Sequence, residues 1–500
     1  MSASGSPQSR KPPSSLPRLT APSSTRQSPL LLLTSVILVL LLAIAFDRWH
    51  RISFLNYGNP LKPTFFQRLA RIPLHKHQSI KPPYSAPRSP CLLWMAPFLS
   101  GGGYCSEAWS YITSLHERIP NPSFILKIEH HGDLVSPEFW QGLPEKSQRL
   151  AFELHSTACR SRDTVVICHS EPGAWYPPLY ETISCPPSGY KSAAIVVGRT
   201  MFETDRLTPE HVRRCNRMDE IWVPTEFHVS TFVGSGVDPS KIVKIVQPVD
   251  IEFFDPAKHE AMALPGQELI LRSRTLGSGS STDVTKKNFV FLSIFKWELR
   301  KGWDVLLRAY LTEFSKTDGV LLCLLISAYH TDTDFSNKIS AFVEEQGIKE
   351  PVGGWAPVRV IRSHIPQAEL PRIYMAADIF VLPSRGEGWG RPIVEAMSMG
   401  LPVIATNWSG PTEYLTQENG YPLPVYEMRE VREGPFKGHL WAEPSVNNLR
   451  GLLRHVVSYP EEAKARGMKA RMDIIKRFSP EVVAKIVSDR IMEIWTSHDG

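Results

Sequence analysis

The chain has 500 residues, of which 42% are hydrophobic and 21% charged, a composition that is typical of a globular protein and excludes a disordered chain. This length predicts two or three domains. The net charge of +6 is uneven, because residues 1–46 contribute +4 and residues 47–90 contribute +7, which leaves −5 for the rest. A slightly acidic body lacks the basic surface that nucleic-acid binding requires, so we expect no nucleic-acid partner.

An uncharged apolar run, LLLLTSVILVLLLAIAF, occupies residues 30–46. At about 1.5 Å per residue, a helix of that length just spans a hydrocarbon core of about 30 Å when its flanking residues snorkel to the interface, and we predict a transmembrane signal anchor here. The basic, Ser- and Pro-rich residues 1–29 form the expected tail, and the Pro-rich residues 47–90 form the expected stalk. A cleaved signal peptide is one alternative, because Ala43-Ile44-Ala45 resembles a cleavage site, although the segment before the run is unusually long. An organellar transit peptide is the other, because the first 28 residues are Ser-rich and free of acids.

The seven cysteines are scattered, without a CxxC pair or the spacing of zinc ligands. This pattern predicts no disulfide framework and no structural metal site. We expect most of them to be small buried hydrophobic residues.

From residue 91 onward, short apolar runs alternate with helical periodicity, which is typical of parallel sheets covered by helices on both faces. The strands expected in the first unit are 91–99, 124–128, 164–168, 193–197, 221–223 and 244–247. Those expected in the second unit are 289–295, 320–327, 358–362, 379–382 and 403–406. The sequence therefore predicts an α/β protein with two Rossmann-like, doubly wound domains. They cover residues 91–261 and 289–478, with a Gly/Ser-rich linker at 262–288 and a terminal helix at 479–500.

The segment SRGEGWGRPIVEAMSMGLPV, residues 384–403, follows one expected strand directly and is the most informative part of the sequence. Its glycines at 386, 388 and 390 allow the backbone to approach a ligand closely, and Pro392 opens a helix whose amino terminus can bind a phosphate. Glu387 and Glu395 are suited to accept hydrogen bonds from hydroxyl groups. A nucleotide sugar, which combines phosphates with hydroxyls, is therefore the expected ligand.

This segment resembles family four of the glycosyltransferases, retaining enzymes of the GT-B fold, because Glu387 and Glu395 match the family's E-x7-E motif. The resemblance extends through GPTEY at 410–414 and covers most of residues 91–495. It implies two domains facing each other across a cleft, with Glu387 at the donor sugar and Glu395 at the ribose. The alternative for Glu395 is an ordinary carboxylate that stabilises the helix dipole. The expected donor-binding residues of this turn also include Gly386, Gly388, Trp389, Gly390 and Arg391.

Three cations, Lys296, Arg300 and Lys301, follow the first strand of the second unit and are expected to face the same crevice. They are suited to neutralise the charge that develops on a departing diphosphate. The resemblance implies an arginine and a lysine here; Lys301 matches the lysine, while Lys296 stands in the place of the arginine and lacks its bidentate fork. Solvated loop cations are the alternative.

In the first unit, His169 follows a strand, and the resemblance implies a histidine of this kind lining the sugar site; a structural histidine is the alternative. Arg199 and Glu203 follow another strand and are candidates for the acceptor side. A loop that closes on the donor or acceptor is also expected here, and its candidate residues are Gly101, Gly102 and Gly103.

Two further motifs are discounted. Asp332-Thr333-Asp334 spells the metal-binding DxD of another glycosyltransferase fold, but it lies away from the glycine-rich turn, and we expect no metal there. Asn407-Trp408-Ser409 is a glycosylation sequon by spelling, but it lies inside the expected donor loop, and we expect it to be unmodified.

These residues and the resemblance together predict a metal-independent hexosyltransferase that uses a nucleotide-diphosphate sugar as co-substrate and no cofactor. The expected acceptor is a glycan, lipid or protein, and retention of configuration is implied by the resemblance. A membrane-anchored protein that binds nucleotide sugars without turnover is the alternative. We expect a single-pass membrane protein of the Golgi or endoplasmic reticulum with a cytoplasmic amino terminus, or alternatively an organellar location.

Overall fold

The computed structural model describes residues 89–119, 123–188, 193, 195–269, 271, 288–327, 334–361 and 365–499. The expected tail, the apolar run at 30–46 and nearly all of the stalk lie outside these residues, as do Asp332 and Thr333. Among the described helices, none is both long enough and apolar enough to cross a membrane.

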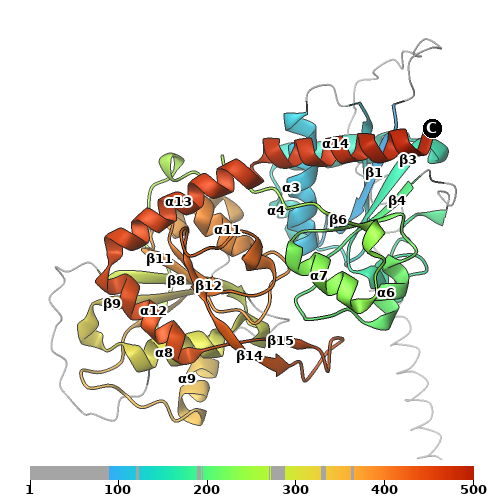
Figure 1. The fold of residues 1–500 in the computed structure, drawn as a ribbon. Coiled ribbons are helices and arrows are strands. Elements are labelled where there is room, and N and C mark those ends of the chain that lie inside the picture. Colours follow the sequence, from blue (N-terminus) through green and yellow to red (C-terminus); the bar gives the residue numbers. More distant parts are fainter. Residues whose placement is uncertain are drawn as a thin grey trace, which may run out of the picture. The chain divides into compact units, whose positions relative to one another are not determined.

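The first domain is built on a parallel sheet of six strands in the order β2-β1-β3-β4-β5-β6 (Figure 1). These strands are β1 (Cys91–Ala96), β2 (Ile125–His130), β3 (Thr164–His169), β4 (Ile195–Arg199), β5 (Glu220–Val223) and β6 (Ile242–Lys244). The helices are α3 (Gly103–Arg118), α4 (Pro137–Gly142), α5 (Glu145–Ser156), α6 (Pro209–Cys215) and α7 (Glu226–Ser235). Every residue of β1 and β3 is buried, which explains why these strands are continuous apolar runs.

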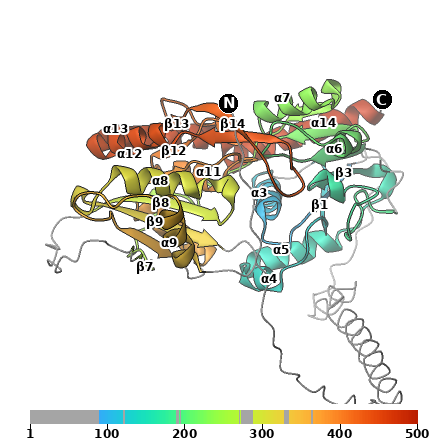
Figure 2. The ribbon, with the colours of Figure 1, turned by 90° about the horizontal axis from the view of Figure 1, so that it is seen from below.

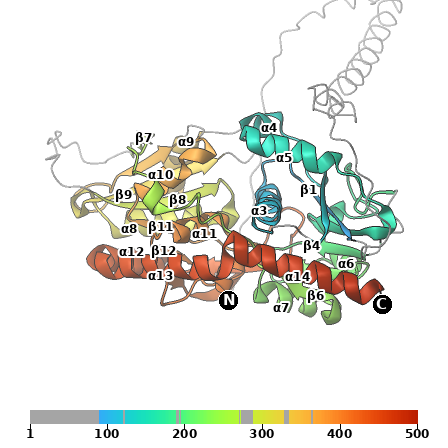
Figure 3. The same cartoon turned by 90° about the horizontal axis from the view of Figure 1, so that it is seen from above.

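The second domain contains a seven-stranded sheet in the order β13-β12-β11-β8-β9-β10-β7, parallel except for the pairing of β7 with β10. Its strands are β7 (Gln267–Glu268), β8 (Phe289–Lys296), β9 (Val320–Ser327), β10 (Val358–Ile361), β11 (Ile379–Leu382), β12 (Val403–Thr406) and β13 (Tyr421–Leu423). Its helices are α8 (Trp303–Glu313), α9 (Phe335–Glu345), α10 (Leu370–Met375), α11 (Arg391–Ser398), α12 (Val446–Ser458) and α13 (Pro460–Phe478). Figures 2 and 3 show α8 and α12 on one face of this sheet and α9 on the other, and Figure 3 shows α10 beside α9.

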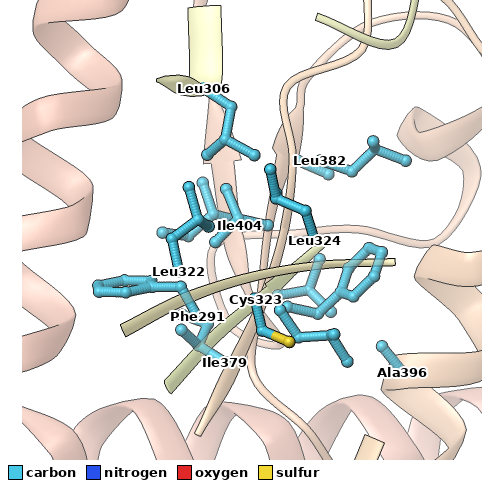
Figure 4. Close-up of a cluster of buried hydrophobic side chains, with 14 of the residues drawn as sticks. Phe291, Leu306, Leu322, Cys323, Leu324, Ile379, Leu382, Ala396 and Ile404 are labelled. Carbon is cyan, nitrogen blue, oxygen red and sulfur yellow. The ribbon is translucent and has the colours of Figure 1, made fainter. Parts of the chain in front are cut away.

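The core of the second domain lies where these helices meet the central strands (Figure 4). Phe291, Leu322 and Ile379 come from the adjacent strands β8, β9 and β11 and are completely buried. Leu306 of α8 and Ala396 of α11 join the same cluster. This core fixes the strands from which the candidate site projects.

Both sheets confirm the predicted doubly wound architecture, although individual elements differ from the sequence expectations. The strand β7 lies inside the segment expected to be a linker and pairs with β10. A hairpin of β14 (Val425–Glu430) and β15 (Leu440–Pro444) was not predicted, because neither strand is a buried apolar run. The expected terminal helix is α14 (Pro480–Asp499), which packs against α3 of the first domain (Figures 1 and 3).

The cysteine prediction was wrong. Cys91 pairs with Cys159, and Cys168 pairs with Cys185, so four of the seven cysteines form disulfides. Cys105, Cys215 and Cys323 are free and buried, as expected of small hydrophobic residues. Both bridges lie in the first domain and link segments that are 68 and 17 residues apart.

Candidate active site

The order of the second sheet places the candidate site. β8 lies between β9 and β11, so the winding direction of the sheet reverses beside it. Ligands of open α/β sheets bind at such a switch point, beyond the carboxyl ends of the strands. The turn at 297–302 leaves β8 there, and the glycine-rich turn at 383–390 leaves β11. The two segments predicted to form the donor site therefore meet.

Close backbone contacts join these two turns. Gly302 has a φ of 67°, and a Cβ atom there would lie 1.9 Å from the carbonyl oxygen of Pro383, so only glycine fits. The N–H of Arg385 donates to the carbonyl oxygen of Arg300 at 2.6 Å. In return, Nη1 of Arg300 donates to the carbonyl oxygen of Gly386 at 2.7 Å.

Glu387 lies at the centre of this arrangement and is only 5% exposed. Lys301 Nζ is 2.8 Å from both of its carboxylate oxygens, and Arg300 Nη1 is 3.4 Å from one of them. Burial raises the pKa of Glu387, but the charges of Lys301 and Arg300 outweigh burial and hold that pKa below its usual value. Glu387 is therefore an anion held between two cations.

The first domain contacts this cluster through the segment that follows β4. Glu203 Oε1 lies 3.6 Å from Arg300 Nη1. A Cβ atom on Gly386 would lie 2.1 Å from the carbonyl oxygen of Glu203, and one on Gly388 would lie 2.7 Å from the sulfur of Met201. The glycines at 386 and 388 therefore allow the two domains to approach each other, and Glu203 lies beside Arg300, while its role toward the acceptor stays a prediction.

Glu395 lies on α11 and is held by two neighbours. Tyr374 donates its hydroxyl hydrogen to Oε2 at 3.0 Å, and Arg391 Nε lies 3.7 Å from Oε1. Burial raises the pKa of Glu395, while Arg391 and Tyr374 act against that rise. Tyr374, on α10, was not among the predicted site residues.

No side chain caps the amino terminus of α11, and its N-cap is Gly390, with a φ of 93°. Pro392 has no N–H and the N–H of Ile393 donates to the Gly390 carbonyl oxygen at 2.9 Å, so this terminus offers an anion the N–H of Arg391 and the helix dipole. Trp389, before this cap, is only 2% exposed and packs on Tyr414 and Phe478. The Tyr414 hydroxyl donates to the Trp389 carbonyl oxygen at 2.5 Å. Trp389 thus packs against the rear of the turn, and its place among the donor-binding residues stays a prediction.

The cation positions differ from expectation in one respect. Lys296 is exposed at the end of β8, where its charge acts on Asp133 of the first domain. Arg300, rather than Lys296, contacts Glu387 beside Lys301. Arg300, the residue directly before Lys301, therefore supplies the guanidinium that was expected from position 296.

The roles predicted for His169 and Arg199 are not supported. The His169 ring is completely buried; Nδ1 accepts a hydrogen bond from Trp94 at 3.0 Å, and Nε2 lies 3.0 Å from Glu107. Arg199 is 1% exposed and also binds Glu107, at 2.6 Å. Arg199 and Glu107 form a buried ion pair at the end of β4, and His169, whose pKa is lowered by burial, hydrogen-bonds the same carboxylate from the end of β3. Neither His169 nor Arg199 therefore presents a free donor or acceptor to a sugar.

Gly101 and Gly102 lie between β1 and α3, and Gly103 begins α3, next to the switch point of the first sheet between β1 and β3. Gly101 has a φ of 74°, and a Cβ atom there would lie 3.0 Å from the Phe139 ring, so its conformation requires glycine. Gly103 is the first residue of α3 and has open space where a side chain would be. The loop therefore lies where its domain would bind a ligand.

Gly102 differs from the expectation of a closing loop. It is the N-cap of α3, with an extended backbone at a φ of −80° and a ψ of −176°, a conformation open to any residue. Its N–H donates to the hydroxyl oxygen of Ser100 at 3.2 Å. The amide of Gly102 is therefore satisfied within the loop, where Gly102 starts α3, and its role toward donor or acceptor stays a prediction.

The two discounted motifs have structural roles in the described residues. Asp334 caps α9 through the N–H of Asn337. Ser409 has a φ of 60°, and its hydroxyl oxygen accepts the N–H of Glu387 at 2.9 Å, which makes the serine of the sequon part of the site. Among the described residues, no group of three or more His, Cys, Asp or Glu side chains is arranged to hold a metal ion.

The protein has two doubly wound domains built on largely parallel sheets, and the turns after β8 and β11 meet at the switch point of the second sheet. This arrangement is that of a GT-B fold. Residues 286–431 match the family model of the Glycosyl transferases group 1, and this segment contains both glutamates and all three cations of the site. Fold and family match together support the resemblance to group 1 glycosyltransferases.

Solved structures share this fold. The sucrose-phosphate synthase of Thermosynechococcus elongatus aligns with a TM-score of 0.53 at 13% identity and covers 82% of this chain and 100% of its own. The Anabaena protein Alr3699/HepE in complex with UDP-glucose aligns with a TM-score of 0.52 at 14% identity and covers 81% of this chain and 100% of its own. At these identities, the similarity is one of fold.

Curated relatives match shorter segments. Sucrose-phosphate synthase 4 of Arabidopsis thaliana is 27% identical over 148 residues, which are 26% of this chain and 14% of the relative. The D-inositol 3-phosphate glycosyltransferase of Corynebacterium jeikeium is 26% identical over 225 residues, which are 43% of this chain and 49% of the relative. The O-antigen chain mannosyltransferase B of Escherichia coli is 46% identical over 63 residues, which are 13% of this chain and 15% of the relative. The chain spans less than two thirds of the length of each.

Proposed function

We propose that the protein is a retaining glycosyltransferase that moves a hexose from a nucleotide-diphosphate sugar to a glycan, lipid or protein acceptor. The observation that carries this proposal is the anionic Glu387, held between Lys301 and Arg300 beside the uncapped amino terminus of α11. A carboxylate that accepts hydroxyls, two cations and an open helix terminus match the sugar and the diphosphate of such a donor. The activities named for the relatives support the same assignment.

In the proposed reaction, the bond between the sugar and the diphosphate breaks while the acceptor oxygen bonds to the same carbon atom. Arg300 and Lys301 stabilise the negative charge that develops on the leaving diphosphate. In this proposal Glu387, paired with Lys301 and Arg300, accepts hydrogen bonds from the sugar hydroxyls and forms no bond to the sugar. The leaving phosphate therefore takes the acceptor's proton on the same face of the sugar, which retains the configuration.

Closure of the two domains excludes water from this step. The contacts of Glu203 and Met201 with the glycine-rich turn lie where that closure occurs. The proposed chemistry is independent of metal ions, because the two cations and the helix terminus supply the positive charge.

The membrane anchor at 30–46 and the luminal orientation belong to the same proposal. The disulfides Cys91–Cys159 and Cys168–Cys185 favour an oxidising compartment such as the lumen of the secretory pathway over a reducing one. Protease digestion of sealed microsomes tests this: epitopes on residues 89–499 should be protected until detergent is added. Digestion without detergent would place the catalytic part in the cytosol.

The activity is tested with the full-length protein in detergent and a panel of UDP- and GDP-sugars. We expect release of the nucleoside diphosphate from one donor, unaffected by EDTA, with the anomeric configuration retained in the product. Glu387→Gln should reduce release by about 100-fold or more, while Glu461→Gln on the exposed start of α13 should not.

Two other outcomes have a clear meaning. Binding of a nucleotide sugar without release, across a broad acceptor panel, would favour the alternative of a binding protein without turnover. Activity with a sugar phosphate and no nucleotide would indicate a phosphorylase instead.

A further inference from the structure

Arg385 is completely buried, one position before the first glycine of the turn. Its guanidinium makes five hydrogen bonds, which matches the five N–H donors of arginine. Nε and Nη2 bind the carboxylate of Glu443 at 2.9 and 2.8 Å. Nη1 and Nη2 bind the carboxylate of Asp304 at 2.8 Å each, and Nη1 also binds the carbonyl oxygen of Leu299 at 2.6 Å.

The main chain of Arg385 reaches the same elements. Its N–H donates to the carbonyl oxygen of Arg300 at 2.6 Å, and its carbonyl oxygen accepts the N–H of Ala442 at 2.9 Å. Arg385 therefore joins the turn at 299–301, the start of α8 and the strand β15.

We propose that Arg385 is a positioning residue that holds the turn carrying Arg300 and Lys301 at the correct distance from Glu387, and thereby sets the grip on the diphosphate. This inference rests on the proposed function, because it requires a diphosphate between those cations. Two bidentate carboxylates and one carbonyl oxygen fix the plane of the Arg385 guanidinium. The glycine-rich turn that carries Arg385 and the turn at 299–301 are thereby held at a fixed distance from each other.

The position of Glu443 extends the connection to the first domain. Glu443 lies on β15, and at the other end of that strand the N–H of Leu440 donates to Asp205 at 2.7 Å. Next to it, His439 Nδ1 lies 3.0 Å from the hydroxyl of Thr204. The hairpin that anchors Arg385 is thus docked on the segment that also carries Glu203.

The chain offers a matched control. Arg429, on β14, also binds Glu443, at 3.3 Å, but its side chain is 32% exposed, and this ion pair does not involve either turn. Asp304, Glu443 and Arg429 all border a cavity of about 360 Å³, so amide substitutions at these positions meet solvent rather than close packing. Arg429→Gln removes one cation from Glu443 and leaves Arg385 in place.

The test is calorimetric titration of the full-length protein in detergent with UDP and UMP, and with GDP and GMP. The monophosphates lack the β-phosphate that Lys301 and Arg300 would bind. The ratio of diphosphate to monophosphate affinity therefore reports the binding of that phosphate. We expect Arg385→Lys to weaken diphosphate binding about tenfold or more while monophosphate binding changes less than about twofold. Arg429→Gln should change neither.

Asp304→Asn and Glu443→Gln each remove one half of the fork and should produce the same selective loss, even if Arg385→Lys does not fold. An unchanged ratio in these variants, or an equal loss for both nucleotides, would overturn the positioning role. Failure of the unsubstituted protein to bind either diphosphate would overturn the proposed function, and the inference with it.

Discussion

The ammonium group of Lys301 lies 2.8 Å from both carboxylate oxygens of Glu387, although the two residues are 86 positions apart in the chain. They meet because β8 and β11 are neighbours in the sheet and their turns leave at the switch point. The contact couples the two halves of the site: whatever moves the lysine changes the charge around the glutamate. Burial and the charge of Arg300 lower the pKa of Lys301. The charge of Glu387 acts in the opposite direction but does not cancel this decrease.

Replacing Lys301 tests this contact. Lys301→Ala removes one of the two cations and should weaken nucleoside diphosphate binding roughly 10- to 100-fold, as expected for the loss of one charge-assisted hydrogen bond. The measurement is calorimetric titration with UDP and GDP. Lys485→Ala on α14, an exposed lysine paired with Asp489, serves as the control. Unchanged diphosphate affinity in the Lys301 variant would remove this lysine from the site.

The turn around Glu387 could be predicted from the sequence because its information is local. A buried strand, alternating glycines and a helix-opening proline lie in one continuous segment, and the carboxyl ends of parallel strands meet at one edge of the sheet. The approach of Gly302 to Pro383 follows from the same adjacency. The second sheet and the meeting of Lys301 with Glu387 were therefore within reach of sequence reasoning.

The outcome for His169 has a different origin, because the direction of its side chain at the end of β3 decides whether the ring faces the crevice or Glu107 on α3. Position alone cannot distinguish a histidine that faces a ligand from one that turns into the core. One signal was present: Glu107 falls among the buried positions Ala108, Tyr111 and Ile112 of α3, and a glutamate on an apolar helix face needs a buried cation. The disulfides carried no such signal, because cysteine pairing cannot be deduced from one sequence.

The cluster of Glu107, His169 and Arg199 should therefore govern stability. Glu107→Gln leaves Arg199 buried with a neutral partner and should lower the free energy of unfolding by about 3–5 kcal/mol. Urea unfolding of this variant at pH 7, compared with Glu418→Gln on the surface, checks the value. If Glu107→Gln had normal stability but no longer bound the donor, the cluster of Glu107, His169 and Arg199 would belong to the active site instead.

The same cluster predicts a pH dependence. Although burial raises the pKa of Glu107, Arg199 and His169 reverse that effect and lower it from 4.5 to about 2. A carboxyl whose pKa is lower in the folded state stabilises the fold above its unfolded pKa, and that contribution disappears as the pH falls. Urea midpoints of the unsubstituted protein should fall between pH 4.5 and about 2, and the Glu107→Gln variant should lack this part of the decrease.

The disulfides make a countable prediction. Of the seven cysteines, Cys105, Cys215 and Cys323 are free, so the protein unfolded in denaturant should react with a thiol reagent at three positions. After reduction, all seven should react. Reduction should also lower the free energy of unfolding by about 2–4 kcal/mol for each bridge that constrains the unfolded chain. Seven reactive thiols before reduction would contradict both bridges and the oxidising compartment proposed from them.

Gly386 tests the approach of the two domains. In Gly386→Ala the new methyl group would lie 2.1 Å from the carbonyl oxygen of Glu203, and backbone on both sides leaves no flexible atom to move. Overpacking of this kind costs about 1–3 kcal/mol, so the rate of sugar transfer should fall roughly 5- to 150-fold. Gly451→Ala is the control, because a Cβ atom there meets nothing within 4 Å. Small-angle scattering should show a larger radius of gyration for the Gly386 variant. An unchanged rate and radius would mean that the contact between Gly386 and Glu203 has no part in the reaction.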